Sequence, residues 1–406
     1  MLRTDLLALI KNGEGSRVEF KRDDLHPRDL AKELVAFANL QGGAVLLGVE
    51  DDGSVSGVQR SDLETWVMNV CRDKIRPALI PTYEVVVDAE PGKDVAVIGV
   101  EPGYAVASRW HDNHHTYFIR VGSESREMDT PELERLMQQR GSVRAELRPL
   151  TNAGVDELDL RRLDDYFGRV RRQTAPDAGD LAAWEQLLVN TELMAETDRG
   201  IVATLAGMAL FGRRVSRFLP QSAIAAAAYP GVEKDYETVG REQLDSPLVG
   251  LFTRAGELAE PGLVEEALGF IERTTGAEFA ISGGRRVTLA RYPEDAVREG
   301  AVNALVHRDY LLHGSDIEMS VYADRVEIVS PGRLPNGITP ARMLAGTRAS
   351  RNQLIKDVMR DYGYMEHMGM GIPFKIVRSM HEHNGTEPEL IEDGERFTLV
   401  LRGQPS

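Results

Sequence analysis

The sequence has almost no cysteine and no long uninterrupted apolar run. Cys71 is the one cysteine among 406 residues, which excludes an intrachain disulfide and any structural zinc site built from several thiols. The most apolar stretches, residues 201–212 and 223–229, meet Gly or Pro before the roughly 20 residues that a membrane-spanning helix needs. Residues 1–9 lack the apolar core of a secretory signal. We therefore expect a cytoplasmic protein with no membrane segment.

The sequence also lacks the positive excess that is typical of proteins coating nucleic acid. Its net charge is -16, from 48 Lys and Arg against 64 Asp and Glu, so the whole molecule repels polyanions at long range. Contact with nucleic acid would need a local basic patch. Residues 17–32, 72–76 and 135–148 are candidates, and each could equally be a solvated helix face.

The length predicts more than one packed unit. A chain of 406 residues exceeds the size at which a single core usually stops growing. The alternation of strand-like and helix-like segments predicts an α/β (α+β) fold. We expect three parts: an N-terminal domain over residues 1–145, a helical linking segment over 146–215, and a C-terminal module over 216–406.

Several segments of the N-terminal part have clear patterns. Residues 18–21 predict a strand, Pro27 opens a helix that runs to Asn39, and the apolar run at 44–49 predicts a buried strand. Asp51, Asp52 and Gly53 then predict a tight turn, with residues 54–58 as the returning strand of a hairpin. His111, His114 and His115 invite a metal site, but their segment is typical of an exposed turn between strands, which we favour.

The remaining elements are predicted by apolar spacing and by proline and glycine. Residues 201–211 predict a helix and residues 224–229 a strand. Pro293 opens a helix that ends near His307, and a hairpin turns at residues 323–324. A last helix begins after Gly369-Met370-Gly371.

Three polar side chains share one face of the helix that ends near His307. Glu299, Asn303 and His307 are spaced four apart among apolar residues, and each step of four drifts only about 40° around a helix. A carboxylate there can polarise a water, and an amide oxygen can complete the shell of a Mg²⁺ held by phosphates. A polar stripe at a helix surface explains the spacing equally well.

Two glycine-rich segments lie near this helix in the sequence. Gly369 and Gly371 would let backbone approach a phosphate at a helix start. Residues 332–352 have the composition of a basic loop that closes over phosphates, although Ser350 or Asn352 could simply cap the next helix.

Residues 293–401 resemble the divergent ATP-binding module of bacterial predicted transcriptional regulators, which is similar to the GHKL fold shared by gyrase, histidine kinases and MutL. The resemblance lies in PEDAVREGAVNALVHRDY from Pro293, SPGRLP from Ser330 and SRN from Ser350. It implies ATP and Mg²⁺ as cofactors, Glu299 as the water-activating base, and Asn303 as the metal ligand. The other implied nucleotide-binding residues are His307, Gly332, Arg351, Asn352, Gly369 and Gly371.

One motif departs from that pattern. Ser330-Pro331-Gly332 replaces the aspartate-containing glycine box that recognises adenine in active ATPases of this fold. Either the base is recognised by other groups, such as backbone, or the module retains the fold without hydrolysing ATP.

Residues 10–135 resemble the Schlafen/AlbA-type domain, which is described as DNA-binding. The resemblance lies in EGSRVEFK from Glu14, AFAN from Ala36, QGG from Gln41, GVEDDG from Gly48 and RVGS from Arg120. It implies a nucleic-acid partner, with DNA favoured over RNA and both left open. Arg17, Lys21, Arg22 and Arg120 are the contacts that we expect.

The same resemblance implies an alternative activity. Some Schlafen proteins are endonucleases that use clustered carboxylates, and Glu14, Glu19, Glu50 and Asp51 match or lie near those acids. Such a cluster could hold divalent ions and activate water. Against this, Glu19 could pair with Lys21 or Arg17, and Asp51 could serve only in the turn.

Three functional hypotheses follow. The first is a nucleic-acid-binding, nucleotide-responsive regulator, a homodimer with weak ATPase activity at most. The second is a metal-dependent Schlafen-type endonuclease whose C-terminal half regulates or dimerises. The third is a catalytically inactive assembly scaffold, which predicts no nucleotide-dependent change in stability.

Overall fold

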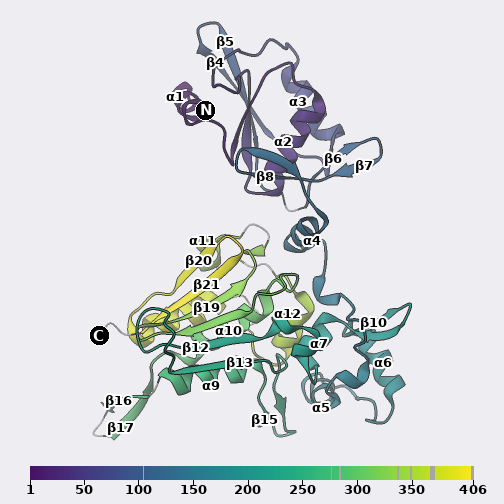
Figure 1. The fold of residues 1–406 in the computed structure, drawn as a ribbon, viewed down its shortest axis with the longest axis vertical. Coiled ribbons are helices and arrows are strands. Elements are labelled where there is room, and N and C mark those ends of the chain that lie inside the picture. The colour runs from purple at the N-terminus through teal and green to yellow at the C-terminus, as the bar shows by residue number, and fades with distance from the viewer. Residues whose placement is uncertain are drawn as a thin grey trace. The chain divides into compact units, whose positions relative to one another are not determined.

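The computed structural model describes residues 1–403 apart from 104, 276, 283, 284, 336, 337, 348, 349 and 366–370, with backbone alone for 277–282 and 285–289. It divides into two compact units, Met1–Val143 and Arg144–Ser406. Figure 1 shows the elements of each unit. Both units mix helices with sheets, which confirms the predicted α/β (α+β) class.

The N-terminal unit is built on a four-stranded sheet of order β1-β2-β5-β4. The strands are β1 (Val18–Lys21), β2 (Gly43–Leu47), β4 (Thr82–Glu90) and β5 (Lys93–Val100), and the helices are α1 (Arg3–Asn12), α2 (Pro27–Asn39) and α3 (Leu63–Asp73). Strand β1 runs parallel to β2, and β5 runs antiparallel to it. Helix α2 is buried along nearly its whole length after the first turn, so it forms the centre of this unit.

Smaller elements complete the N-terminal unit. A three-stranded sheet of order β3-β6-β7 and a β8-β9 hairpin precede helix α4. Their bounds are β3 (Ile75–Arg76), β6 (Ser108–His111), β7 (His114–Thr116), β8 (Phe118–Val121), β9 (Glu124–Glu127) and α4 (Thr130–Gln139). Asp129 caps α4 in a capping box with Glu132, which fixes where that helix begins.

The predicted hairpin after β2 is only partly formed. Residues 51–53 make the turn, but Val49 and Val55 meet in a single bridge and residues 54–58 form no strand. Gly57 adopts a positive φ of 79°, which is incompatible with an extended strand, so the returning segment turns away.

The C-terminal unit is built on a six-stranded sheet of order β13-β12-β18-β19-β21-β20. Its strands are β12 (Ile224–Ala228), β13 (Gly240–Leu244), β18 (Ile317–Val321), β19 (Arg325–Pro331), β20 (Glu389–Asp393) and β21 (Arg396–Arg402). Helix α9 (Leu263–Thr275) packs on β12, β13 and β18, and α10 (Glu294–His307) packs on α9 and β19. The predicted helix at 293–307 and the predicted hairpin at 317–330 are confirmed.

The other elements of this unit surround the sheet and the two helices. They are η1 (Ala145–Leu147), η2 (Val155–Glu157), α5 (Leu160–Asp164), η3 (Asp165–Val170), α6 (Leu181–Asn190), β10 (Met194–Thr197), β11 (Gly200–Ala203), α7 (Leu205–Phe211), α8 (Val215–Phe218), η4 (Pro220–Ser222), β14 (Leu251–Phe252), β15 (Leu258–Glu260), β16 (Ala277–Ser282), β17 (Arg285–Ala290), α11 (Pro340–Leu344), α12 (Gln353–Asp361), η6 (Gly371–Arg378) and α13 (Ser379–Asn384).

The predicted helix at 201–211 was wrong in its first turn. Residues 200–203 form strand β11, paired with β10, and the helix begins only after Thr204. The β-branched Ile201 and Val202 favour the strand, and the Thr204 side chain caps the helix by accepting from the Gly207 N–H.

One buried apolar cluster runs from Ala153 to Leu401 and crosses the boundary predicted at residue 215. The division into three parts therefore stays a prediction. In the described part of the chain, every helix falls short of the length and apolar character that a bilayer crossing requires.

Asn39, at the end of α2, offers a test of how the N-terminal unit is held together. Its buried amide donates to the carbonyls of Ala107 (2.8 Å) and Phe118 (3.0 Å), and its oxygen accepts from the Ala107 N–H (2.8 Å). We expect Asn39→Ala to lower the free energy of unfolding of this unit by about 3 kcal/mol, because buried backbone groups lose their partners. Hydrogen exchange of residues 30–47 in urea would measure it, with the exposed Asn12→Ala as control. Equal protection in both variants would contradict the prediction.

Candidate functional site

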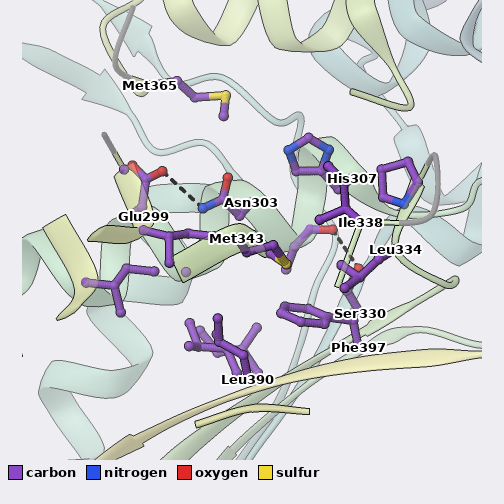
Figure 2. A pocket seen from close by; sticks show the side chains of 18 of the residues that line it. Glu299, Asn303, His307, Ser330, Leu334, Ile338, Met343, Met365, Leu390 and Phe397 are labelled. Atoms are coloured by element: carbon purple, nitrogen blue, oxygen red, sulfur yellow. Dashed lines mark hydrogen bonds between the residues drawn. The ribbon is translucent and has the colours of Figure 1, made fainter. Parts of the chain in front are cut away.

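A cavity of about 210 Å³ lies beside helix α10 in the C-terminal unit. Residues of α10, η6 and α12 line it together with strands β19, β20 and β21 and the segment 332–347, which includes α11. Figure 2 shows Glu299, Asn303 and His307 along one side of the cavity, with Leu390 and Phe397 across from them. The structure thus places the three side chains that share a helix face in one cavity.

Glu299 and Asn303 form a pair within this cavity. The Asn303 amide donates to Glu299 Oε1 at 3.0 Å (Figure 2), and Glu299 is only 4% exposed. With its N–H group turned to the carboxylate, Asn303 keeps its amide oxygen for another partner. A carboxylate and an amide oxygen are ligands that Mg²⁺ accepts, so this donor set fits the metal that the sequence resemblance implies.

Gly371 is positioned directly against the Glu299 carboxylate. A Cβ added at Gly371 would lie 1.9 Å from Glu299 Oε1, so no larger residue fits here without displacing the carboxylate or the start of η6. This close approach explains the glycine that the sequence places at this helix start. Gly369, the other predicted glycine, lies outside the described residues.

The part of the basic side of the cavity that α12 contributes was not predicted from the sequence. Arg333, Lys356 and Arg360 line it, and Arg333 lies 3.4 Å from Glu395 across the strand end. Lys356 and Arg360 are four residues apart in α12 and therefore share one helix face. This four-residue spacing is visible in the sequence and indicates a shared helix face, but only the fold shows that the face borders the cavity.

Most of the remaining lining is apolar. Its apolar side chains include Ile328, Leu334, Ile338, Met343, Met365, Ile372, Ile376, Leu390, Phe397 and Leu399. Such a surface, joined to a cationic side and a carboxylate–amide pair, suits a ligand with a flat apolar part and an anionic part.

Ser330 belongs to the segment that replaces the aspartate-containing glycine box in this sequence, and it also lines the cavity. Its hydroxyl donates to the carbonyl of Ala304 at 2.9 Å, as Figure 2 shows, so this proton is already used within the protein. The Ser330 oxygen can still accept, but it cannot replace a carboxylate as a strong acceptor for an amino group.

Three of the predicted nucleotide-binding residues, Gly332, Arg351 and Asn352, contact other parts of the protein itself. Gly332 lines the cavity with a φ of 115°, and an added Cβ would lie 2.3 Å from Arg351 Nη1. Arg351 donates to the carbonyls of His307 (2.8 Å) and Arg333 (2.6 Å). Neither Arg351 nor Asn352 is among the described residues that line the cavity. Their predicted role in nucleotide binding stays untested by this geometry.

In the N-terminal unit, Arg120 is buried instead of facing solvent. Its side chain is 0% exposed and bridges Glu19 and Glu33, with 3.1 Å between Nη1 and Glu33 Oε2. Ser125 also donates to Glu33. Arg120 therefore holds two buried carboxylates in place. The sequence indicated neither Glu33 nor Ser125, since they lie on α2 and β9, far from Glu19 in the chain.

The candidate nuclease carboxylates have different surroundings. Glu19 also pairs with Lys21, and Glu14 Oε1 accepts from the Phe20 N–H at 2.8 Å. Glu50 lies 3.9 Å from Arg22, and Asp51 is exposed in the turn. No group of three or more His, Cys, Asp or Glu among the described residues is placed to hold a metal ion. The endonuclease hypothesis therefore gains no support from this geometry.

Of the predicted nucleic-acid contacts, Arg17, Lys21 and Arg22 reach the surface. Arg17 is exposed, and the Arg22 side chain is 64% exposed beside Asp24. Burial acts to lower the pKa of Lys21, but the hydrogen bond and charge of Glu19 and other nearby carboxylates raise it above its usual value. Lys21 thus remains a cation.

Comparison with known proteins gives one match in each unit. Residues 14–129 match the family model "Schlafen, AlbA_2", and residues 314–401 match HATPase_c_4, described as "Putative ATP-dependent DNA helicase recG C-terminal". Both resemblances predicted from the sequence are thereby confirmed. Among solved structures, the DIP2311 protein from Corynebacterium diphtheriae is 20% identical, with a TM-score of 0.45 over 100% of this chain and 80% of that one. No curated protein matches the chain.

His307, in the cavity wall, makes the folding stability of the protein depend on pH. Its ring is half-buried, and burial, followed by the charges of Lys356 and Arg351, lowers the pKa of His307 to about 3. The folded protein thus holds a neutral imidazole where the unfolded chain binds a proton below about pH 6.5. Stability from this group is complete above pH 6.5 and falls as the pH drops towards 3.

We expect this group to lower the free energy of unfolding by at most about 2 kcal/mol between pH 7 and pH 5. Urea unfolding of wild type and His307→Gln at both pH values would measure the difference, because the variant cannot titrate there. The exposed His313→Gln variant is the control and should keep the wild-type pH dependence. An identical pH dependence in His307→Gln would contradict the assignment.

Proposed function

We propose that this protein is a nucleotide-responsive regulator that binds ATP with Mg²⁺ in the cavity beside α10 and nucleic acid through its N-terminal unit. The observation that carries the proposal is the Glu299–Asn303 pair in a cavity with an apolar side and a side lined by Arg333, Lys356 and Arg360. The two matched family models support the same division of roles.

Each part of the cavity suits one part of a nucleotide. The apolar residues on β19, β20 and β21 would contact the base, and the cations of α12 would attract the phosphates. When bound, Mg²⁺ would neutralise phosphate charge, and Asn303 would offer it an amide oxygen. His307, neutral at physiological pH, can donate or accept a hydrogen bond at this wall without adding charge.

In this proposal Glu299 acts as the base. It is the carboxylate that α10 presents to the cavity, and its hydrogen bond from Asn303 fixes its orientation. It would take a proton from an attacking water during slow hydrolysis. Because Ser330 replaces the base-recognising aspartate, we expect base recognition to be weaker than phosphate recognition.

The N-terminal unit would contact the nucleic-acid backbone, DNA in the first instance, through Arg17, Lys21 and Arg22. These side chains lie at or next to strand β1, and phosphate contacts of this kind give affinity without reading sequence. Nucleotide binding would then shift the arrangement of a homodimer and so couple the two ligands.

Thermal unfolding tests the nucleotide part of the proposal. ATP with Mg²⁺ at about 100 times its dissociation constant should stabilise the folded protein by about 2.7 kcal/mol, which raises the unfolding midpoint by a few degrees. Asn303→Ala should lose the Mg²⁺-dependent part of the shift, because the metal loses its amide ligand. Asn190→Ala, at the exposed end of α6, is the matched control and should keep the full shift. No shift with wild type at millimolar ATP would refute nucleotide binding.

The role of Glu299 is tested by turnover. Glu299→Gln keeps the shape of the side chain and an oxygen that can accept from Asn303, but it cannot accept a proton from water. We expect the thermal shift with ATP and Mg²⁺ to persist while phosphate release falls by at least about 100-fold. Phosphate release from purified wild type and variant would be compared directly. If the variant hydrolyses ATP at the wild-type rate, Glu299 is not the base.

A further inference from the structure

The β6–β7 hairpin of the N-terminal unit carries a row of aromatic rings on one face. Trp110 and His115 are directly paired across the two strands, and Ser108 and Tyr117 follow on the same face by strand alternation. The ring centroids of Trp110 and His115 lie 4.6 Å apart, and those of His115 and Tyr117 lie 6.2 Å apart with planes 17° from parallel. Figure 1 shows this hairpin at the rim of its unit.

The middle ring of this row is fixed in place. The Ser108 hydroxyl lies 2.7 Å from His115 Nδ1 and holds the imidazole between its neighbours. The backbone N–H of Trp110 donates to the carbonyl of Lys74 at 2.7 Å, which ties the hairpin to the end of α3. Asp112 and Asn113 form the turn with positive φ values of 48° and 63°, as a two-residue hairpin turn requires. The rings are therefore preorganised.

The two faces of the hairpin differ in what they contact. Ile75, opposite Arg109 across β3 and β6, is completely buried, and Arg109 lies over the Phe118 ring at 4.7 Å. At the base of the hairpin, that face packs against the core. Trp110 is absent from the four described hydrophobic clusters and from the residues packed against them, and His115 is exposed. Tyr117 alone joins the row to a buried cluster.

Positive charge lies beside the aromatic row. Strand β3 pairs Arg76 with Ser108, which places Arg76 on the same face as Trp110. Its guanidinium donates through Nη1 to the carbonyls of Arg72 and Ile75, which fixes the head group at the carboxyl end of α3. Lys74 and Arg72 precede it. The fold thus joins the basic stretch 72–76 to the histidine segment, two motifs far apart in the sequence.

We propose that this aromatic row, consisting of Trp110, His115 and Tyr117, is a stacking site for the bases of single-stranded nucleic acid, with Arg76 contacting its phosphates. Unpaired bases expose the flat faces that rings can stack on, whereas bases in a duplex are already stacked on both sides. A local cation compensates for the negative charge of the whole molecule. The inference rests on the nucleic-acid part of the proposed function and adds the kind of strand and the residues that hold it.

The test is a binding titration with fluorescein-labelled single strands of about 12 nucleotides, oligo(dT) and oligo(U), and with a duplex of the same length. Trp110→Ala should weaken binding of at least one single strand by about tenfold or more and leave duplex binding unchanged. Trp110→Phe keeps a ring and should recover most of the affinity. His114→Ala removes an exposed side chain from the other face of the same hairpin and should bind as wild type.

Two readouts guard against a folding artefact. The thermal unfolding midpoint of each variant is compared with that of wild type. In addition, quenching of wild-type tryptophan fluorescence by the unlabelled single strand should be mostly absent in Trp110→Phe, since stacking occurs on the Trp110 indole.

The possible failures are distinct. If wild type binds nucleic acid but Trp110→Ala keeps its single-strand affinity, or loses single-strand and duplex affinity equally, the stacking site is refuted and the proposed function stands. If wild type binds none of the three probes, the nucleic-acid part of the proposed function falls, and this inference falls with it.

Discussion

The carboxyl end of helix α10 is the point on which the C-terminal unit depends. A helix leaves its last carbonyls without partners inside the helix, and burying them unpaired would cost about 1–3 kcal/mol each. Asn352, completely buried, donates to the carbonyls of Val306 (2.8 Å) and Arg308 (2.9 Å), and Arg351 donates to that of His307. The Arg308 side chain turns back to the carbonyls of Gln221, Leu312 and Ser315. These contacts fix α10 against the sheet and set the position of the cavity.

The geometry of the cavity follows from these contacts at the end of α10. Because Arg351 and Asn352 hold α10 from the start of α12, they also fix Lys356 and Arg360 one and two turns further along. On the opposite side, Gly371 admits the Glu299 carboxylate at the start of η6. The cations of α12 and the carboxylate–amide pair are therefore placed by the same few backbone contacts, so a change at the end of α10 would alter both the cavity and the stability of the fold.

In the N-terminal unit, a buried ionic group likewise fixes separate elements against one another. Arg120 joins β8 to Glu19 on β1 and Glu33 on α2, and removing one partner of such a buried group typically costs about 3–5 kcal/mol. This explains why an arginine that the sequence offers as a phosphate contact lies inside the fold. In the proposed function, the surface contacts with nucleic acid therefore fall to the side chains near β1 and to the β6–β7 hairpin.

The sequence by itself determined most of the local elements and both domain resemblances. The helix ending at His307 and the strand pair after it followed from proline position and apolar spacing, which are properties of neighbouring residues, and they placed Glu299, Asn303 and His307 on one face. Tertiary structure alone decided which polar residues face a cavity and which satisfy buried backbone. Arg120, Arg351 and Asn352 look like ligand contacts in the chain, yet they bond to groups up to 105 positions away. The pairing that places Arg76 on the same sheet face as Trp110 and His115 was likewise decided only by tertiary structure, because no local pattern encodes which distant strand a segment will join.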